Sequence, residues 1–172
     1  RQQATSVTGL DISDELITLA RQRSNEKGLS IDYRIQDLRQ SWPHFEADII
    51  CAFEIIEHLS EPIESFIAKC DQIASEKCYL YISSLNKTLL AKILAIWLTE
   101  EVLGWLDPGT HDFDSFIPLD ELINKLSPQW ELIDLEGVTW SIKQQRFVSS
   151  ASTDIHYLCC FRRKQNGSAF SH

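Results

Sequence analysis

Alternating and continuous apolar runs along the chain predict a succession of strands and helices. Runs with the length and spacing of strands lie at 6–11, 31–35, 47–53, 78–83, 130–138 and 155–161. One helix is expected after Ser13, which can cap its N-terminus, and Gly28 is placed to end it. A second helix is expected over 62–74, where apolar residues recur at the helical spacing. The run at 47–53 is continuous, which is typical of a strand covered on both faces.

This alternation predicts the fold class. Strands separated by crossover helices favour an α/β, doubly wound, Rossmann-like sheet that is mainly parallel. The last two runs, 130–138 and 155–161, have a short connection without a helical pattern, so we expect them to form an antiparallel pair at the sheet edge. We expect one domain over 1–164, and a disordered tail over 165–172.

Composition narrows the function. The chain has 172 residues, 44% of them hydrophobic, which suits one domain with a core of its own. A net charge of -9 with scattered Lys and Arg argues against a nucleic-acid partner and favours a small-molecule substrate. The five cysteines show no C-x-x-C spacing and are expected to be reduced core thiols in a reducing compartment. No signal peptide or membrane-spanning run is visible, and the start at Arg1 without any Met suggests an excerpt.

Acidic residues follow the first two strand runs, where ligands bind in open α/β sheets. Asp11 can accept the hydroxyl hydrogens of an adenosine ribose, or it caps the next turn. Asp37 is a candidate contact to an adenine amino group, with a solvated loop carboxylate as the alternative. A glycine-rich cofactor loop normally lies about 20 residues before such an acid. That position falls before Arg1, so we expect the first strand and this loop to be missing.

The stretch CAFEIIEHLSEP, residues 51–62, places three ionisable groups after a buried run. Glu54, Glu57 and His58 are spaced i, i+3 and i+4, so they share one face if the chain is helical after Phe53. Two carboxylates and an imidazole can bind a divalent cation, with His58 as third ligand or as general base. The alternative is a helix start with acids near its N-terminus and an incidental surface histidine.

Several motifs together resemble one family. In chain order they are VTGLDIS, CAFEIIEHLSEP, ISSLNKT, PGTHDFDSFIPLDEL and DIHYLCC. They resemble the class I S-adenosylmethionine-dependent O-methyltransferases of ubiquinone biosynthesis, and the similarity covers nearly all of 6–163. The resemblance implies that Asp11 holds the cofactor ribose and that Phe53, where the family usually has Met, contacts the adenosyl group. It also implies a magnesium ion at Glu54, Glu57 and His58. The chain departs from the family before 78–83, where SEK replaces a usual Pro-Gly-Gly turn.

The expected reaction is methylation of a hydroxyl on a polyprenylated phenol or catechol. Such an in-line transfer needs alignment of the reactants, exclusion of water and removal of the hydroxyl proton. The cation could lower the pKa of the substrate hydroxyl, or His58 could take the proton directly. His111 in the GTHD segment is a second candidate base, and a turn-ordering histidine is the alternative.

A helical insertion is expected at about 86–117. Its stretch 89–106 is too charged to span a membrane and too apolar for an ordinary surface helix. We expect a lid that receives a polyprenyl tail or enters the bilayer interface, with a core or dimer helix as the alternative. The expected location is cytoplasmic at the inner membrane, or the mitochondrial matrix face, and this allows other ubiquinone-biosynthesis proteins as partners.

Two other functions fit part of the pattern. A nucleotide-dependent dehydrogenase would also place Asp11 on a ribose, but it has no need for the E-x-x-E-H cluster. A catalytically silent lipid-binding module predicts that methyl transfer is absent even when the missing segment is restored.

Overall fold

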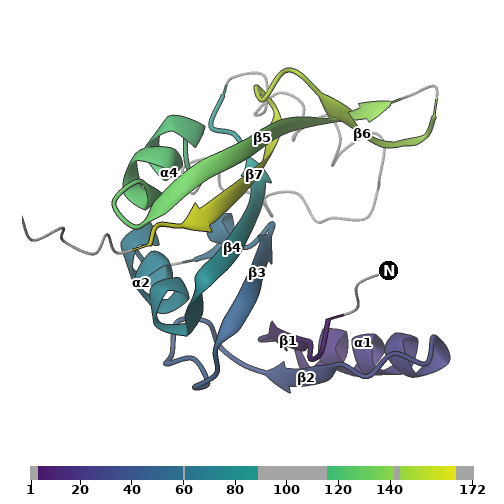
Figure 1. Ribbon diagram of the computed structural model, residues 1–172. Helices are drawn as coiled ribbons and strands as arrows, with labels where there is room; N and C mark the ends of the chain where they lie inside the picture. Colours follow the sequence, from purple (N-terminus) through teal and green to yellow (C-terminus); the bar gives the residue numbers. More distant parts are fainter. Residues whose placement is uncertain (1–3, 60, 89–115, 142–143, 166–172) are drawn as a thin grey trace, which may run out of the picture. The chain divides into compact units, whose positions relative to one another are not determined.

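The computed structural model describes residues 4–59, 61–88, 116–141 and 144–165. Its contacts divide the chain into two compact units, residues 1–44 and 45–172, which are described in turn (Figure 1). The expectation of one domain over 1–164 stays a prediction. Among the described residues, none of the helices combines the length and the apolar character needed to cross a membrane.

The first unit is a small β–α–β arrangement. Strand β1 (Thr8–Asp11) leads into helix α1 (Asp14–Glu26), and strand β2 (Asp32–Ile35) pairs in parallel with β1. Ser13 caps α1 as predicted, because its side-chain oxygen accepts the N–H of Leu16 at 3.2 Å. Gly28 follows the helix with a φ of 65°, a left-handed conformation that glycine adopts without steric cost. The local predictions for this unit are confirmed.

The second unit is a five-stranded sheet with helices. Its elements are β3 (Ala47–Phe53), the 3-10 helix η1 (Ile56–His58), α2 (Ile63–Ile73), β4 (Ala74–Leu85), α4 (Leu119–Leu126), β5 (Trp130–Ser141), β6 (Arg146–Ser150) and β7 (His156–Arg163). The strand order is β3-β4-β7-β5-β6. Strands β3 and β4 are parallel, whereas β7 is antiparallel to both of its neighbours and β6 is antiparallel to β5. The α/β class and the antiparallel last strand are confirmed.

One face of this sheet carries the core. Helices α2 and α4 contact each other, and α4 also contacts β5 (Figure 1). Alternate residues of β4, among them Leu80 and Ile82, are fully buried together with Phe66 of α2 and Leu122 of α4. Each such side chain contributes about 1.5–3 kcal/mol relative to an exposed position. This packing holds the strand ends that carry the candidate site.

The expectation that 47–53 is covered on both faces is wrong for the described structure. Burial alternates along β3, so that Ile50 and Ala52 are buried while Ile49 and Phe53 remain 62% and 51% exposed. The continuous apolar run therefore predicted the strand correctly. It did not predict whether the second face of the strand is covered, because that depends on other segments.

The end of the chain also differs from expectation. Strand β7 lies between β4 and β5, not at the sheet edge, and the edge position belongs to β6. Strand β6 and helix α4 are not among the elements expected from the sequence. Both are short, and α4 lies next to the segment assigned to an insertion. Most of that insertion and of the predicted tail, 165–172, falls outside the described residues. Cys70, Cys78, Cys159 and Cys160 are buried, Cys51 is exposed, and all five are free thiols.

Candidate active site

In the first unit, Asp11 lies at the carboxyl end of β1. Its Oδ1 accepts the backbone N–H of Ser13 at 2.8 Å, so the carboxylate caps the turn into α1. This is the alternative that the sequence left open for Asp11. A carboxylate has further acceptor sites on its second oxygen, so the same group can still accept a hydroxyl hydrogen. The capping contact therefore fixes the side chain without excluding the ribose role, which stays a prediction.

Asp37 lies on the same edge, because β1 and β2 are parallel and Asp11 pairs in register with Ile35. Its carboxylate is held by Arg39, whose Nε and Nη2 atoms lie 2.9 and 2.7 Å from Oδ1 and Oδ2. The backbone N–H of Arg39 also donates to Oδ1 at 2.9 Å. An adenine contact by this carboxylate would have to compete with the ion pair. The arrangement favours the loop alternative, and the cofactor role stays a prediction.

In the second unit, strand β3 ends at Phe53, and Glu54 follows it. Phe53 pairs with Ser83 of β4 and is half exposed, so its ring offers an apolar surface at the carboxyl end of the parallel pair. Glu54 has a φ of 53°, a conformation that costs a non-glycine residue free energy. The backbone turn is held by a hydrogen bond from the N–H of Glu54 to the carbonyl of Ser83, 3.1 Å long.

The Glu54 side chain is fixed by two further strands. Its Oε1 accepts the hydroxyl of Ser83 at 2.6 Å, and Nε2 of His156, the first residue of β7, lies 2.6 Å from the same oxygen. The other nitrogen of His156, Nδ1, is buried and has no hydrogen-bond partner among the described residues. Strand β7 is thus placed so that one of its side chains holds a carboxylate from the end of β3.

Glu57 is the most buried acid of the site, with 5% of its surface exposed. Its Oε2 accepts the hydroxyl of Ser84, itself fully buried, at 3.0 Å. The expected α-helix after Phe53 is not formed. The chain makes a 3-10 turn at Ile56–His58, and Glu54 precedes this turn in a left-handed conformation. The α-helical geometry that this prediction assumed from 54 onward is therefore absent, although the carboxyls of Glu54 and Glu57 still interact with each other.

The pKa values of the two carboxyls are shifted in opposite directions. Burial and the neighbouring charge of Glu54 raise the pKa of Glu57, and the Ser84 hydroxyl and the nearby His58 offset only part of this. Burial alone would raise the pKa of Glu54 too, but hydrogen bonds with His156 and Ser83 lower it overall. Pairs of acids with divergent pKa values are typical of acid–base sites. Of the two, Glu57 is the better proton acceptor.

The predicted magnesium ligands do not form a three-ligand group. Within the described ranges, no cluster of three or more His, Cys, Asp or Glu side chains could hold a metal ion. His58 is exposed, while Glu54 and Glu57 are hydrogen-bonded to serines of β4. These residues as placed do not fit a magnesium site of three protein ligands, and the metal stays a prediction through which no chemical step is derived.

Several site residues were not identified from the sequence. Ser83, Ser84 and His156 hold the two carboxylates. Asn86 donates from Nδ2 to the carbonyl of Thr153 at 3.0 Å and accepts the N–H of Leu119 at its Oδ1, so it joins β4, the start of α4 and the segment before β7. The signal was the run SSLN, because polar residues at the end of an otherwise buried strand need partners. His111 and the stretch 89–106 lie outside the described residues.

Comparisons with known proteins show which family and which relatives this chain resembles. Residues 1–82 match the family described as "Methyltransferase domain". A "Ubiquinone biosynthesis O-methyltransferase" of Mesorhizobium japonicum is 33% identical over 156 residues, 88% of this chain and 61% of the relative. The protein of the same name from Agrobacterium fabrum is 28% identical over 166 residues, 94% of this chain and 65% of the relative.

The match to the methyltransferase-domain family is thus confined to residues 1–82, while the similarity to the ubiquinone-biosynthesis O-methyltransferases extends over most of the chain. The chain spans less than two thirds of the length of these curated relatives.

Solved structures share the fold of this chain. N-methyltransferase NodS from Bradyrhizobium japonicum, in complex with S-adenosyl-L-homocysteine, has a TM-score of 0.62 and 16% identity, over 92% of this chain and 66% of that one. The [4+2]-cyclase SpnF has a TM-score of 0.64 and 17% identity, over 97% of this chain and 70% of that one. Proteins with different reactions share this architecture, so the fold alone does not fix the reaction.

Proposed function

We propose that this chain forms the substrate-binding and proton-accepting part of an S-adenosylmethionine-dependent O-methyltransferase. The proposed substrate is a polyprenylated phenol or catechol of ubiquinone biosynthesis. The observation that carries the proposal is the Glu54–Glu57 pair, held by Ser83 and Ser84 at the carboxyl end of the parallel strands β3 and β4. Ligands of open α/β sheets bind at this edge. The similarity to ubiquinone-biosynthesis O-methyltransferases over most of the chain supports it.

In this proposal each residue has one task. When bound, S-adenosylmethionine supplies a methyl group on a sulfonium centre. Asp11 accepts hydrogen bonds from the ribose hydroxyls through its second oxygen, while Ser13 keeps the carboxylate in place. The half-exposed ring of Phe53 provides the apolar contact to the adenosyl group. These contacts orient the reactants, which is a large share of catalysis in a displacement reaction.

Proton removal is assigned to His58, with Glu57 as the carboxyl beside it. Glu57 has the raised pKa, so it accepts a proton more readily than Glu54 does. His58 follows Glu57 in η1, and its charge acts on that carboxyl. We propose that His58 accepts the phenolic proton and that Glu57 stabilises the resulting imidazolium. General-base catalysis of this kind contributes roughly 100- to 10,000-fold in rate.

The test uses the protein in its full natural length. Calorimetric titration with S-adenosylmethionine, followed by transfer of a tritiated methyl group to a short-tailed catechol, measures binding and reaction separately. Asp11→Asn is expected to weaken cofactor binding at least about tenfold. His58→Asn is expected to leave cofactor binding unchanged and to lower kcat about 100-fold or more. Glu136→Gln on β5 serves as the control.

Cofactor binding without methyl transfer to any catechol would contradict the proposed reaction and favour a silent lipid-binding module. Repeating the assay with a chelator and with added magnesium tests the metal. A rate that does not respond to either is expected, because the described residues do not form a three-ligand magnesium site.

The polyprenyl tail and the membrane surface are assigned to the stretch 89–106. Its apolar residues include Trp97 and Trp105. Flotation with liposomes is expected to recover the protein, and Trp97→Glu with Trp105→Glu is expected to reduce recovery strongly, because a charge in the interface is costly. Trp97→Tyr is the matched control. Equal recovery of all variants would end the membrane assignment.

A further inference from the structure

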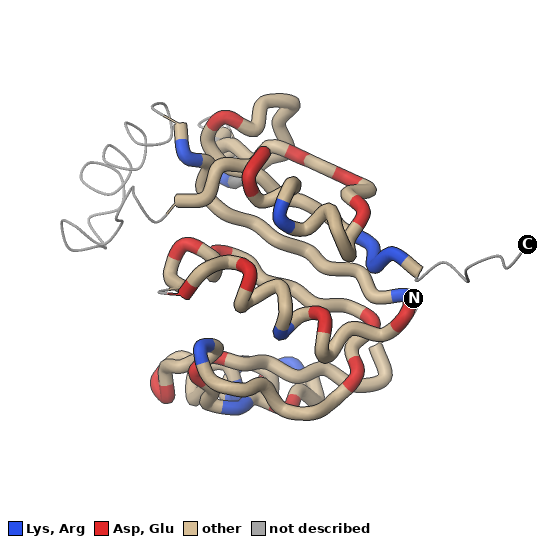
Figure 2. The backbone as a smooth tube through the Cα atoms, turned by 90° about the vertical axis from the view of Figure 1, so that its left-hand side faces the viewer, with Lys and Arg blue, Asp and Glu red and all other residues tan. Residues whose placement is uncertain are grey.

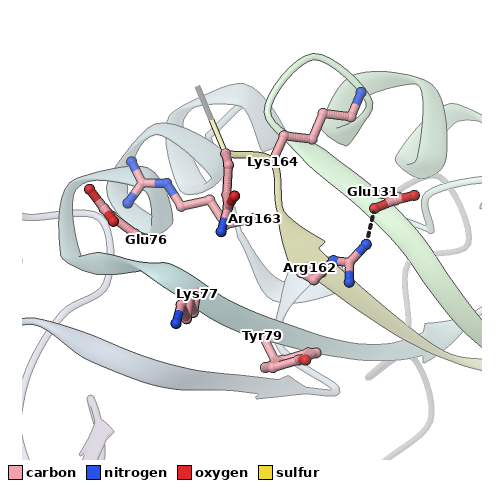
Figure 3. A pocket seen from close by; sticks show the side chains of 8 residues that line it. Glu76, Lys77, Tyr79, Glu131, Arg162, Arg163 and Lys164 are labelled. Atoms are coloured by element: carbon pink, nitrogen blue, oxygen red, sulfur yellow. Dashed lines mark hydrogen bonds and ion pairs between the residues drawn. The ribbon is translucent and has the colours of Figure 1, made fainter. Parts of the chain in front are cut away.

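The five-stranded sheet carries a cleft of about 560 Å³ at the end opposite to the candidate active site (Figure 3). It is lined by Glu76, Lys77 and Tyr79 at the start of β4, by Glu131 of β5, and by residues 162–165 where β7 ends. Tyr79 and Ser84 are five residues apart on β4, roughly 17 Å along an extended strand. The cleft is thus separate from the Glu54–Glu57 pair.

The cleft concentrates positive charge in an acidic protein. The chain has a net charge of -9, yet four lining residues are Lys or Arg, at 77, 162, 163 and 164, against two glutamates. Figure 2 shows basic residues thinly spread among acidic ones, with a basic run where the chain approaches its C-terminal trace. A local reversal of charge sign inside a concave site attracts anions.

Two of the four cations are already committed to the backbone. Arg163 donates from Nη1 to the carbonyl of Ala74, and Lys164 donates to the carbonyl of Ser127. These contacts close the wall of the cleft between β4 and the end of β7. Lys77 and Arg162 make no such backbone contact among the described residues, so they are the cations whose side chains are not tied to the wall.

Lys77 and Arg162 flank one aromatic ring. Arg162 and Tyr79 are direct neighbours in the β4–β7 register, and Lys77 lies two residues before Tyr79 on the same face of β4 (Figure 3). Lys77 is exposed and has no ion-pair partner within the part of the chain that the structure describes. Arg162 donates from Nη2 to Oε2 of Glu131 at 2.6 Å, in a pair whose side chains are both 51% exposed. An exposed pair of this kind is weak, so a doubly charged anion can displace the glutamate.

We propose that this cleft binds a phosphate group, with Arg162 and Lys77 as its ligands and Tyr79 as the contact for the group esterified to it. The guanidinium of Arg162 can hold two phosphate oxygens at once, and Lys77 adds a point charge. Glu131 is a competing intramolecular occupant of Arg162. The ring of Tyr79, 37% exposed, lies where an apolar or aromatic ester substituent would extend. The proposal is independent of the methyl transfer proposed above.

Because Glu131 competes with the ligand for Arg162, substitutions at these two positions are expected to change phosphate affinity in opposite directions. The 172-residue chain is titrated with inorganic pyrophosphate and with phenyl phosphate, and amide shifts at 76–79 and 162–165 are followed by NMR. Arg162→Gln is expected to weaken pyrophosphate binding at least about tenfold. Glu131→Gln is expected to strengthen it severalfold, because Arg162 is released. Tyr79→Ala is expected to weaken phenyl phosphate more than pyrophosphate.

Matched control variants distinguish binding in this cleft from an effect of net charge alone. Arg146→Gln and Glu136→Gln change the net charge by the same amounts on the same sheet but outside the cleft, and both are expected to change affinity less than twofold. Circular dichroism confirms that each variant is folded, which is expected because the exchanged side chains are exposed. Equal effects of Arg162→Gln and Arg146→Gln would overturn the proposal, as would weaker binding by Glu131→Gln.

A second arm distinguishes a soluble phosphate ester from a lipid headgroup. Vesicles of phosphatidylcholine with and without phosphatidic acid are sedimented with the protein, with pyrophosphate as competitor. Binding only to phosphatidic acid vesicles, lost in Arg162→Gln, would support the site with a lipid as its source. Binding to neither soluble ligand nor vesicles would overturn it.

Discussion

Because the backbone at Glu54 is left-handed, we expect glycine to give a more stable protein than alanine at this position, the reverse of the usual order. We compare Glu54→Ala with Glu54→Gly. Both variants lose the hydrogen bonds of the carboxylate with Ser83 and His156. The side chain is 45% exposed, so water replaces much of what is lost, and we expect each substitution to cost about 1–2 kcal/mol on this account.

The two variants differ in the backbone. A residue with a Cβ loses about 1–2 kcal/mol in the left-handed conformation, which glycine recovers. Glycine in turn loses about 0.5–1 kcal/mol relative to alanine through its greater freedom in the unfolded chain. Because the φ of Glu54 is 53°, we expect Glu54→Gly to be more stable than Glu54→Ala by about 0.5–1 kcal/mol.

Equilibrium unfolding in urea, followed by tryptophan fluorescence, measures the difference. The control pair is Glu136→Ala and Glu136→Gly in the middle of β5, where glycine should be the less stable variant by about 0.5–1 kcal/mol. If alanine is at least as stable as glycine at position 54, the backbone at the end of β3 is not strained and the account of how Glu54 is presented is wrong.

Four further predictions concern the fold that carries the site. Gln145→Gly should raise stability by about 1 kcal/mol in the same assay, because Gln145 also has a positive φ, of 48°; a loss of stability would contradict this. Gly137→Ala should lower the free energy of unfolding by more than about 2 kcal/mol, because a Cβ would lie 1.7 Å from the carbonyl oxygen of Ser152; a Tm equal to that of the parent would refute it. Trp130→Phe should cost about 1–3 kcal/mol, because the indole N–H donates to Asp71 at 2.7 Å. Burial raises the pKa of Asp71 despite this hydrogen bond. The stability that Asp71 contributes through this shift is therefore present at low pH and is lost as the pH rises through the pKa of the folded state. Asp71→Asn should remove this pH dependence from the free energy of unfolding measured in urea.

Short-range features of the sequence determined the elements around the site. Ser13 and Gly28 fixed the ends of α1, and the helical spacing of apolar residues over 62–74 fixed α2, because caps and amphipathic faces are decided within a few residues. The position of Asp11 after a strand-like run also placed it at a strand end, as observed, although the predicted burial of this strand is wrong, because its residues are exposed or only partly buried. These predictions needed no knowledge of distant segments.

The order of the strands and the partners of the acids were decided only by the tertiary structure. An apolar run such as 155–161 fits an edge or a central position equally well, and its place between β4 and β5 depends on pairing with strands far along the chain. The contact of Glu54 with His156 joins residues 102 positions apart, and the serines that hold Glu54 and Glu57 come from β4. Local periodicity records which residues prefer burial, whereas the hydrogen bonds that set charge and geometry depend on which strands finally pair.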